Sequence, residues 1–154
     1  MHNSSEQPRA PSFTRSFAKA PVMMILHSAV PVFVLVVEDE MLLRMRAVDM
    51  VEDAGFTPLE AVDADEAVAI LDARSDIALL FTDIQMPGKM DGLMLAHAVH
   101  ERWPKIKIIL VSGQVRPAIS DIPPDSRFFG KPLEAREMIA QMQSMIGQPG
   151  QNPQ

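Results

Sequence analysis

Polar residues of types that can take part in catalysis follow four apolar runs in this sequence. Glu38 and Asp39 follow residues 32–37, Asp83 follows 77–82, Ser112 follows 106–111, and Lys131 follows 127–130. If the runs are parallel strands, their carboxyl ends meet at one edge of a sheet, and these side chains gather there. Three carboxylates at one edge repel one another and require a cation. An all-oxygen pocket suits Mg²⁺, which keeps several of its waters.

The same residue types fit phosphoryl transfer. That reaction needs an oxygen nucleophile in line with the leaving group, a metal that neutralises the phosphoryl oxygens, and fixed donors around them. Asp83 can be the nucleophile and form an acyl phosphate. Glu38 and Asp39 can hold the metal, Ser112 can donate a hydrogen bond, and Lys131 supplies a positive charge. Each residue alone has an ordinary structural explanation, so the prediction depends on their combination.

Helices and strands alternate along the chain and must position these residues. The patterns predict strands at 32–37, 57–62, 77–82, 106–111 and 127–130, and helices at 40–54, 63–74, 92–103 and 133–146. Gly55 is a natural helix C-cap, and Pro104 ends the third helix. Asp63 with Glu66 resembles a capping box.

This alternation predicts an α/β fold of parallel βαβ units. Five strands fit a flavodoxin-like, doubly wound parallel sheet in the order 2-1-3-4-5. The connection at 114–126 contains three prolines, Pro117, Pro123 and Pro124, so its helix should be shortened to about one turn.

We expect one domain at residues 32–147, a flexible extension at 1–31 and a tail at 148–154. Basic residues before the apolar run 22–37 superficially resemble a signal peptide, but Pro21 and Pro31 interrupt the run and no cleavage site follows. We therefore predict a cytoplasmic protein that does not span a membrane, because a span needs about 20 apolar residues. The net charge of −6 argues against nucleic-acid binding, and the absence of cysteine excludes thiol chemistry.

Residues 79–92, LLFTDIQMPGKMDG, resemble the phosphoacceptor strand and loop of CheY-like receiver domains from two-component response regulators. The resemblance extends over about 32–146. It implies that Asp83 is the phosphoacceptor and that the backbone carbonyl of Gln85 joins Glu38, Asp39 and Asp83 around Mg²⁺. It also implies that Ser112 and Phe128 form a conformational switch, and that the Lys131–Pro132 bond is cis.

Three features depart from the usual pattern of that family. Glu38 replaces the commoner aspartate, the MPGKMDG loop has one extra residue, and Phe128 lacks the hydroxyl of a switch tyrosine.

The first helix is predicted to have two apolar faces. One face should pack on the sheet and comprises Leu43, Ala47, Met50, Val51 and Ala54. Met41, Met45 and Val48 form a second stripe, which we interpret as a partner site. By resemblance, Met41, Leu42 and Met45 would dock a histidine kinase. We interpret His97 and His100 as surface residues, because no further ligands complete a metal site.

The leading hypothesis is a stand-alone phosphoacceptor, not an enzyme, that takes a phosphoryl group from a sensor histidine kinase or a histidine phosphotransfer protein. No output domain is expected, so signalling would proceed through a protein effector, and a homodimer is compatible. A phosphorylation-independent pseudo-receiver is one alternative. An Asp-nucleophile phosphatase is another, but it needs a second acid where Gln85 stands. No phosphate-binding glycine loop supports a nucleotide switch.

Overall fold

The computed structural model describes residues 30–147. The predictions for residues before 30, which include most of the extension and the first part of the signal-peptide-like run, lie outside these residues. The prediction for the tail at 148–154 lies outside them too. The described part contains a five-stranded parallel sheet in the order β2-β1-β3-β4-β5, as predicted. Its strands are β1 Phe33–Val37, β2 Thr57–Ala61, β3 Ile77–Asp83, β4 Lys107–Ser112 and β5 Arg127–Gly130.

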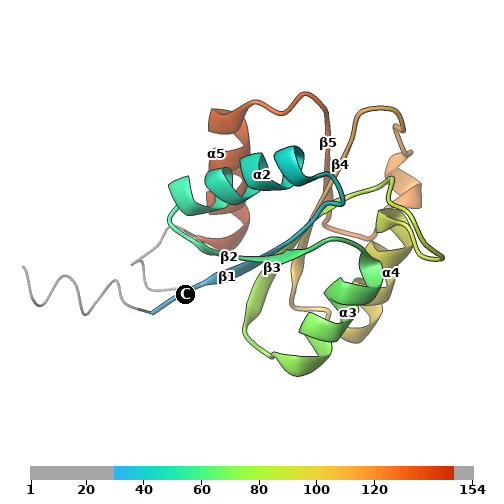
Figure 1. Ribbon diagram of the computed structural model, residues 1–154, viewed down its shortest axis with the longest axis horizontal. Helices are drawn as coiled ribbons and strands as arrows, with labels where there is room; N and C mark the ends of the chain where they lie inside the picture. The colour runs from blue at the N-terminus through green and yellow to red at the C-terminus, as the bar shows by residue number, and fades with distance from the viewer. Residues whose placement is uncertain (1–29, 148–154) are drawn as a thin grey trace, which may run out of the picture. The chain divides into compact units, whose positions relative to one another are not determined.

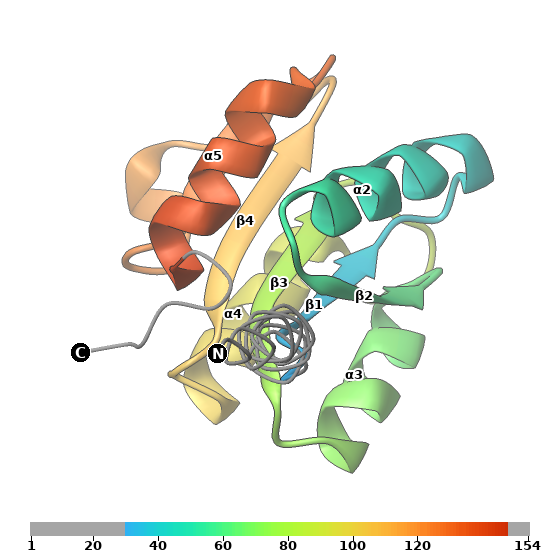
Figure 2. The same cartoon turned by 90° about the vertical axis from the view of Figure 1, so that its left-hand side faces the viewer.

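In the part of the chain that the structure describes, four α-helices cover the two faces of this sheet. They are α2 Met41–Asp53, α3 Ala64–Ala73, α4 Gly92–Arg102 and α5 Ala135–Ile146. Helices α2 and α5 lie on one face and α3 and α4 on the other (Figures 1 and 2). Every predicted strand and helix is present, with ends that differ from the predicted ones by at most two residues.

Two apolar cores form because successive strand residues point to opposite faces of the sheet. In β1, Val34 and Val36 pack toward α2 and α5, while Leu35 and Val37 pack toward α3 and α4. All four are fully buried. Burial on both faces explains why the strand is a continuous apolar run rather than an alternating one.

Side-chain caps fix where the helices begin. Glu40 accepts a hydrogen bond from the backbone N–H of Leu43 at the start of α2. At α3, Asp63 accepts from the Glu66 N–H at 2.9 Å. Glu66 in turn accepts from the N–H of Val62, one residue before the cap, so the predicted capping box reaches further back.

The connection between β4 and β5 contains only one 3₁₀ turn, η2 Ile119–Asp121, within the described residues. This confirms the prediction of a shortened fourth helix. The turn is tied to α4, because Nε2 of His97 lies 2.8 Å from the backbone carbonyl oxygen of Asp121. His97 is exposed, as predicted, and this contact gives it a structural role.

Two predicted packing positions are wrong. Leu43 is 37% exposed, because it lies over a cavity near the start of α2 instead of against the sheet. Val48 is only partly exposed and packs against the core on the flank of α2, so it does not belong to the outer stripe.

Candidate functional site

Three carboxylates converge where β1 and β3 end. Glu38 and Asp39 follow β1, Asp83 is the last residue of β3, and the two strands are hydrogen-bonded neighbours. One carboxylate oxygen from each residue lies within 4.8 Å of the others. Glu38 and Asp83 are buried, at 4% and 7% exposure, whereas Asp39 is exposed. The predicted gathering of acids is therefore present.

Lys131 reaches this cluster from the end of β5. Its Nζ lies 3.1 Å from a carboxylate oxygen of Glu38 and 3.1 Å from one of Asp83. The backbone N–H of Lys131 donates to the Ser112 carbonyl, which extends the pairing of β4 and β5 by one residue. The Lys131–Pro132 bond is cis, as expected. One ammonium group thus bridges two buried acids that lie 45 residues apart in sequence.

Burial and charge shift the pKa values of this pair. Loss of solvent raises the pKa of Glu38, and the negative charge of Asp83 adds to the rise, while the Glu40 N–H and Lys131 oppose it. For Lys131, burial alone would lower the pKa. The hydrogen bonds to Glu38 and Asp83 and their charges outweigh burial, so its pKa is raised. Lys131 is therefore held in its charged form, and Glu38 lacks full compensation for its buried charge.

The donor set fits a hard divalent cation. Three carboxylates face a single ammonium group, so the cluster carries an excess of negative charge. All the candidate ligands are oxygens, and exposed Asp39 leaves one side open to water. Mg²⁺ prefers oxygen ligands and retains part of its hydration shell. Glu38, Asp39 and Asp83 are therefore the residues that could hold such an ion.

The remaining predicted site residues lie around the same edge. Gln85 is exposed and donates its backbone N–H to the Asp83 carboxylate over a long 3.4 Å. Ser112 is buried at the end of β4, and its Oγ accepts hydrogen bonds from the N–H groups of Gln114 and Val115 at 3.2 and 2.9 Å. Its hydroxyl hydrogen thus stays available for donation.

Phe128 lies in β5, three residues before Lys131, and is only partly buried. Its ring packs against the core between the sheet and the helices α3 and α4. The guanidinium of Arg116 lies 6.0 Å from the ring centroid, at the limit of a cation–π contact. Phe128 is therefore partly exposed at the surface, with the Arg116 guanidinium near its ring.

Two features of the site were not identified from the sequence. Gly92, the first residue of α4, donates its N–H to the Ile84 carbonyl at 2.7 Å and leaves no space for a side chain against β3. Arg44, on α2, donates to the Glu38 carbonyl and to the Glu60 carboxylate. The sequence did contain a signal for Arg44. It is a charged residue among the apolar positions of a helix that packs on the core, which indicates that it needs a polar partner there.

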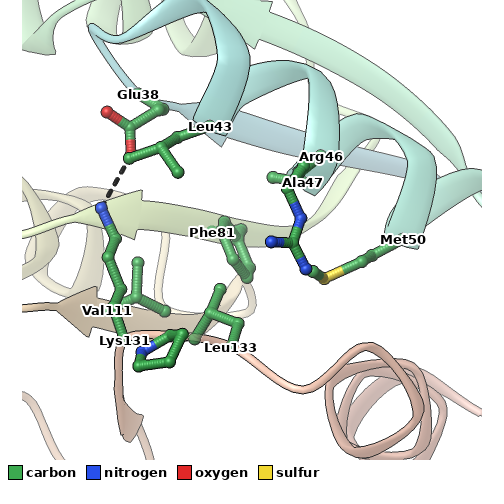
Figure 3. Close-up of a pocket in the computed structure, with 10 residues that line it drawn as sticks. Glu38, Leu43, Arg46, Ala47, Met50, Phe81, Val111, Lys131 and Leu133 are labelled. Atoms are coloured by element: carbon green, nitrogen blue, oxygen red, sulfur yellow. Dashed lines mark hydrogen bonds and ion pairs between the residues drawn. The ribbon is translucent and has the colours of Figure 1, made fainter.

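A small cavity opens beside the carboxylates, between α2 and the segment that follows β5. Its volume is about 80 Å³. Figure 3 shows Leu43, Ala47 and Met50 of α2 on one side, Phe81 and Val111 of the sheet behind, and Leu133 opposite, with the Glu38–Lys131 pair at its edge. Farther out on α2, Met41, Leu42 and Met45 are 60%, 67% and 54% exposed. The predicted docking residues thus form an accessible apolar patch.

Comparison with known proteins gives a consistent family match. The sequence profile described as "Response regulator receiver domain" matches residues 34–143. The response regulator receiver protein CpdR of Brucella abortus is 31% identical over 116 residues, which cover 73% of this chain and 95% of that protein. The sensor kinase CckA of the same species is 32% identical over 117 residues, but the match spans only 12% of its length.

Solved structures agree with these sequence matches. The receiver domain of NtrX from Brucella abortus is 30% identical and superposes with a TM-score of 0.67, covering 73% of this chain and 97% of that one. A response regulator receiver protein from Sinorhizobium medicae gives a TM-score of 0.69 at 26% identity, covering 77% and 96%. Within residues 30–147, no helix is long and apolar enough to cross a membrane.

Proposed function

Because this chain belongs to the family of response regulator receiver domains, we propose that Asp83 accepts a phosphoryl group from a phosphohistidine in a Mg²⁺-dependent reaction. Family membership makes the chain a signalling phosphoacceptor rather than a classical enzyme. The observation that carries the proposal is the convergence of Glu38, Asp39 and Asp83 around Lys131 at one sheet edge. The donor would be a sensor histidine kinase or a histidine phosphotransfer protein.

The chemistry assigned to this chain's residues is simple. A carboxylate oxygen of Asp83 attacks phosphorus opposite the donor's P–N bond. The new P–O bond forms as the P–N bond breaks. The electron pair of the broken P–N bond stays on the histidine ring nitrogen. Mg²⁺, when bound, would neutralise charge on the phosphoryl oxygens. Glu38, Asp39 and Asp83, with the Gln85 carbonyl, would hold it. Water later hydrolyses the acyl phosphate, which restores the carboxylate.

Two residues would report the modification. Lys131 would turn from the Asp83 carboxylate to the phosphoryl oxygens, because these carry more negative charge. The Ser112 hydroxyl would donate to the same group, and its movement would let Phe128 turn inward. The outcome is a change of affinity for a protein effector, produced by a local charge and read through a two-state element.

The apolar patch formed by Met41, Leu42 and Met45 is proposed as the docking site of the phosphodonor. It lies at the start of α2, directly after Glu38 and Asp39, so a helix bound there would bring its histidine close to Asp83. Exposed apolar clusters of this kind mark partner sites.

The proposal is tested with a small-molecule phosphodonor, with and without Mg²⁺, followed by intact-protein mass spectrometry. We expect one acid- and base-labile phosphoryl group per chain, only with Mg²⁺. Asp83→Asn should abolish it. Asp91→Asn is the matched control, because Asp91 caps α4 in the same loop and asparagine caps a helix equally well. Labelling of Asp83→Asn would refute the assignment. A pseudo-receiver would gain no label, and a phosphatase would release phosphate over many turnovers.

A further inference from the structure

Arg44 is a largely buried arginine that none of the roles above requires. Its side chain is 16% exposed. Nε lies 3.1 Å from Oε1 of Glu60, at the end of β2, and the NH1 group donates to the backbone carbonyl of Glu38 at 2.9 Å. One guanidinium thereby joins α2, β2 and the loop that carries Glu38 and Asp39.

The carbonyl that Arg44 holds belongs to the peptide unit between Glu38 and Asp39. A peptide unit is planar, so fixing its carbonyl also fixes its N–H and the position from which Asp39 begins. This matters because Asp39 is exposed, and within residues 30–147 its carboxylate accepts no hydrogen bond. The Glu38 carboxylate, by contrast, is held by the Glu40 N–H and by Lys131. The starting position of the Asp39 side chain is therefore set by its backbone.

We propose that Arg44 is a positioning residue of the cation site. It holds the Glu38–Asp39 peptide in the orientation that places the Asp39 carboxylate near Asp83, and Glu60 holds the guanidinium in turn. The inference rests on the proposed function, because it takes Glu38, Asp39 and Asp83 as the Mg²⁺ ligands.

The direction of the effect separates positioning from simple electrostatics. Arg44 is a positive charge in contact with the Glu38 backbone, next to the cation site, so by Coulomb's law alone its removal should strengthen the binding of a cation. If Arg44 instead aims Asp39, its removal should weaken binding. Loss of groups that orient metal ligands typically costs 10- to 100-fold in metal affinity.

The experiment is calorimetric titration of the full chain with Mg²⁺ alone, at fixed ionic strength. We expect Arg44→Met to weaken Mg²⁺ binding about tenfold or more. Glu60→Ala should weaken it in the same direction, since the guanidinium loses its anchor. Arg44→Lys should recover part of the affinity, because one ammonium cannot reproduce the fork that reaches both partners.

Arg46→Met is the matched control. Arg46 lies two residues further along α2 and lines the cavity beside Glu38, and it makes no hydrogen bond to the Glu38 carbonyl. Its loss removes the same charge, so Mg²⁺ binding should be unchanged or tighter. In addition, the backbone amide resonance of Asp39 should shift in Arg44→Met before Mg²⁺ is added, and stay in place in Arg46→Met.

The outcomes distinguish the two proposals. If the natural chain binds no Mg²⁺, the proposed function fails, and this inference with it. If the natural chain binds and a folded Arg44→Met binds equally or more tightly, only the role of Arg44 is overturned. An equal loss in Arg46→Met would also overturn it. Should Arg44→Met fail to fold, Arg44→Lys decides, because it keeps the positive charge and loses the fork that reaches both partners. Natural Mg²⁺ affinity in Arg44→Lys would then overturn the role of Arg44.

Discussion

A methyl group added at Gly92 would collide with the strand that carries the phosphoacceptor. An ideal Cβ built at this residue lies 1.7 Å from the carbonyl oxygen of Asp83 and 2.9 Å from the Cα of Ile84. These are backbone atoms, so no side chain can turn aside. Ordinary contact begins at 3.4 Å, and the start of α4 or the end of β3 must therefore move by about 1.7 Å.

This geometry sets the expected cost of Gly92→Ala. Overpacking a well-packed position costs about 1–3 kcal/mol, and the displacement also endangers the Gly92–Ile84 hydrogen bond, worth about 1 kcal/mol. The intrinsic preference of a helix for alanine over glycine offsets at most about 1 kcal/mol of this destabilisation. We expect a net destabilisation of about 1–3 kcal/mol, because the helix preference for alanine offsets roughly what the hydrogen bond contributes. We also expect slower phosphorylation of Asp83, because the acid moves with the strand.

The assay is urea unfolding followed by tryptophan fluorescence, combined with the rate of labelling by a small phosphodonor. Trp103 is the only tryptophan in the chain, and it caps the far end of α4, so it reports directly on this helix. Gly113→Ala is the control, since a Cβ there meets only the Lys131 side chain at 3.7 Å. That variant should stay within about 0.5 kcal/mol of the natural protein. Natural stability and natural labelling in Gly92→Ala would refute the reasoning.

Two further predictions concern the site and the docking patch. Lys131→Ala leaves Glu38 and Asp83 facing each other without a cation, so we expect a loss of about 1–3 kcal/mol in urea unfolding without Mg²⁺ and a smaller loss with it. A loss that Mg²⁺ leaves unchanged would contradict this. Met45→Glu should slow transfer from a histidine kinase at least tenfold while labelling by a small phosphodonor stays normal, because Met45 is 54% exposed and is not one of the residues assigned to the chemistry. Equal rates with the kinase would remove Met45 from the docking site.

Packing around α2 shows which side-chain positions could not be predicted from the sequence. The period of the apolar residues correctly placed Ala47, Met50 and Val51 in the core. Periodicity also assigned Leu43 to the core and Val48 to the outside, and both assignments were wrong. A helical period gives the direction of a side chain about its own axis. It does not tell how far the sheet extends beneath the helix or where a cavity remains.

The sequence alone was enough to place the strands and helices and to bring Glu38, Asp83 and Lys131 to one edge of the sheet. Apolar runs, caps and prolines are local signals of where elements begin and end, parallel strands bring their carboxyl ends to one edge, and the strand order followed from the fit to a flavodoxin-like sheet. Two contacts became visible only in the folded chain: Arg44 bridges Glu60 and the Glu38 carbonyl, and Gly92 lies against Asp83. These are contacts between separate elements, whose existence depends on the distance between packed backbones, and no pattern within one element encodes that distance.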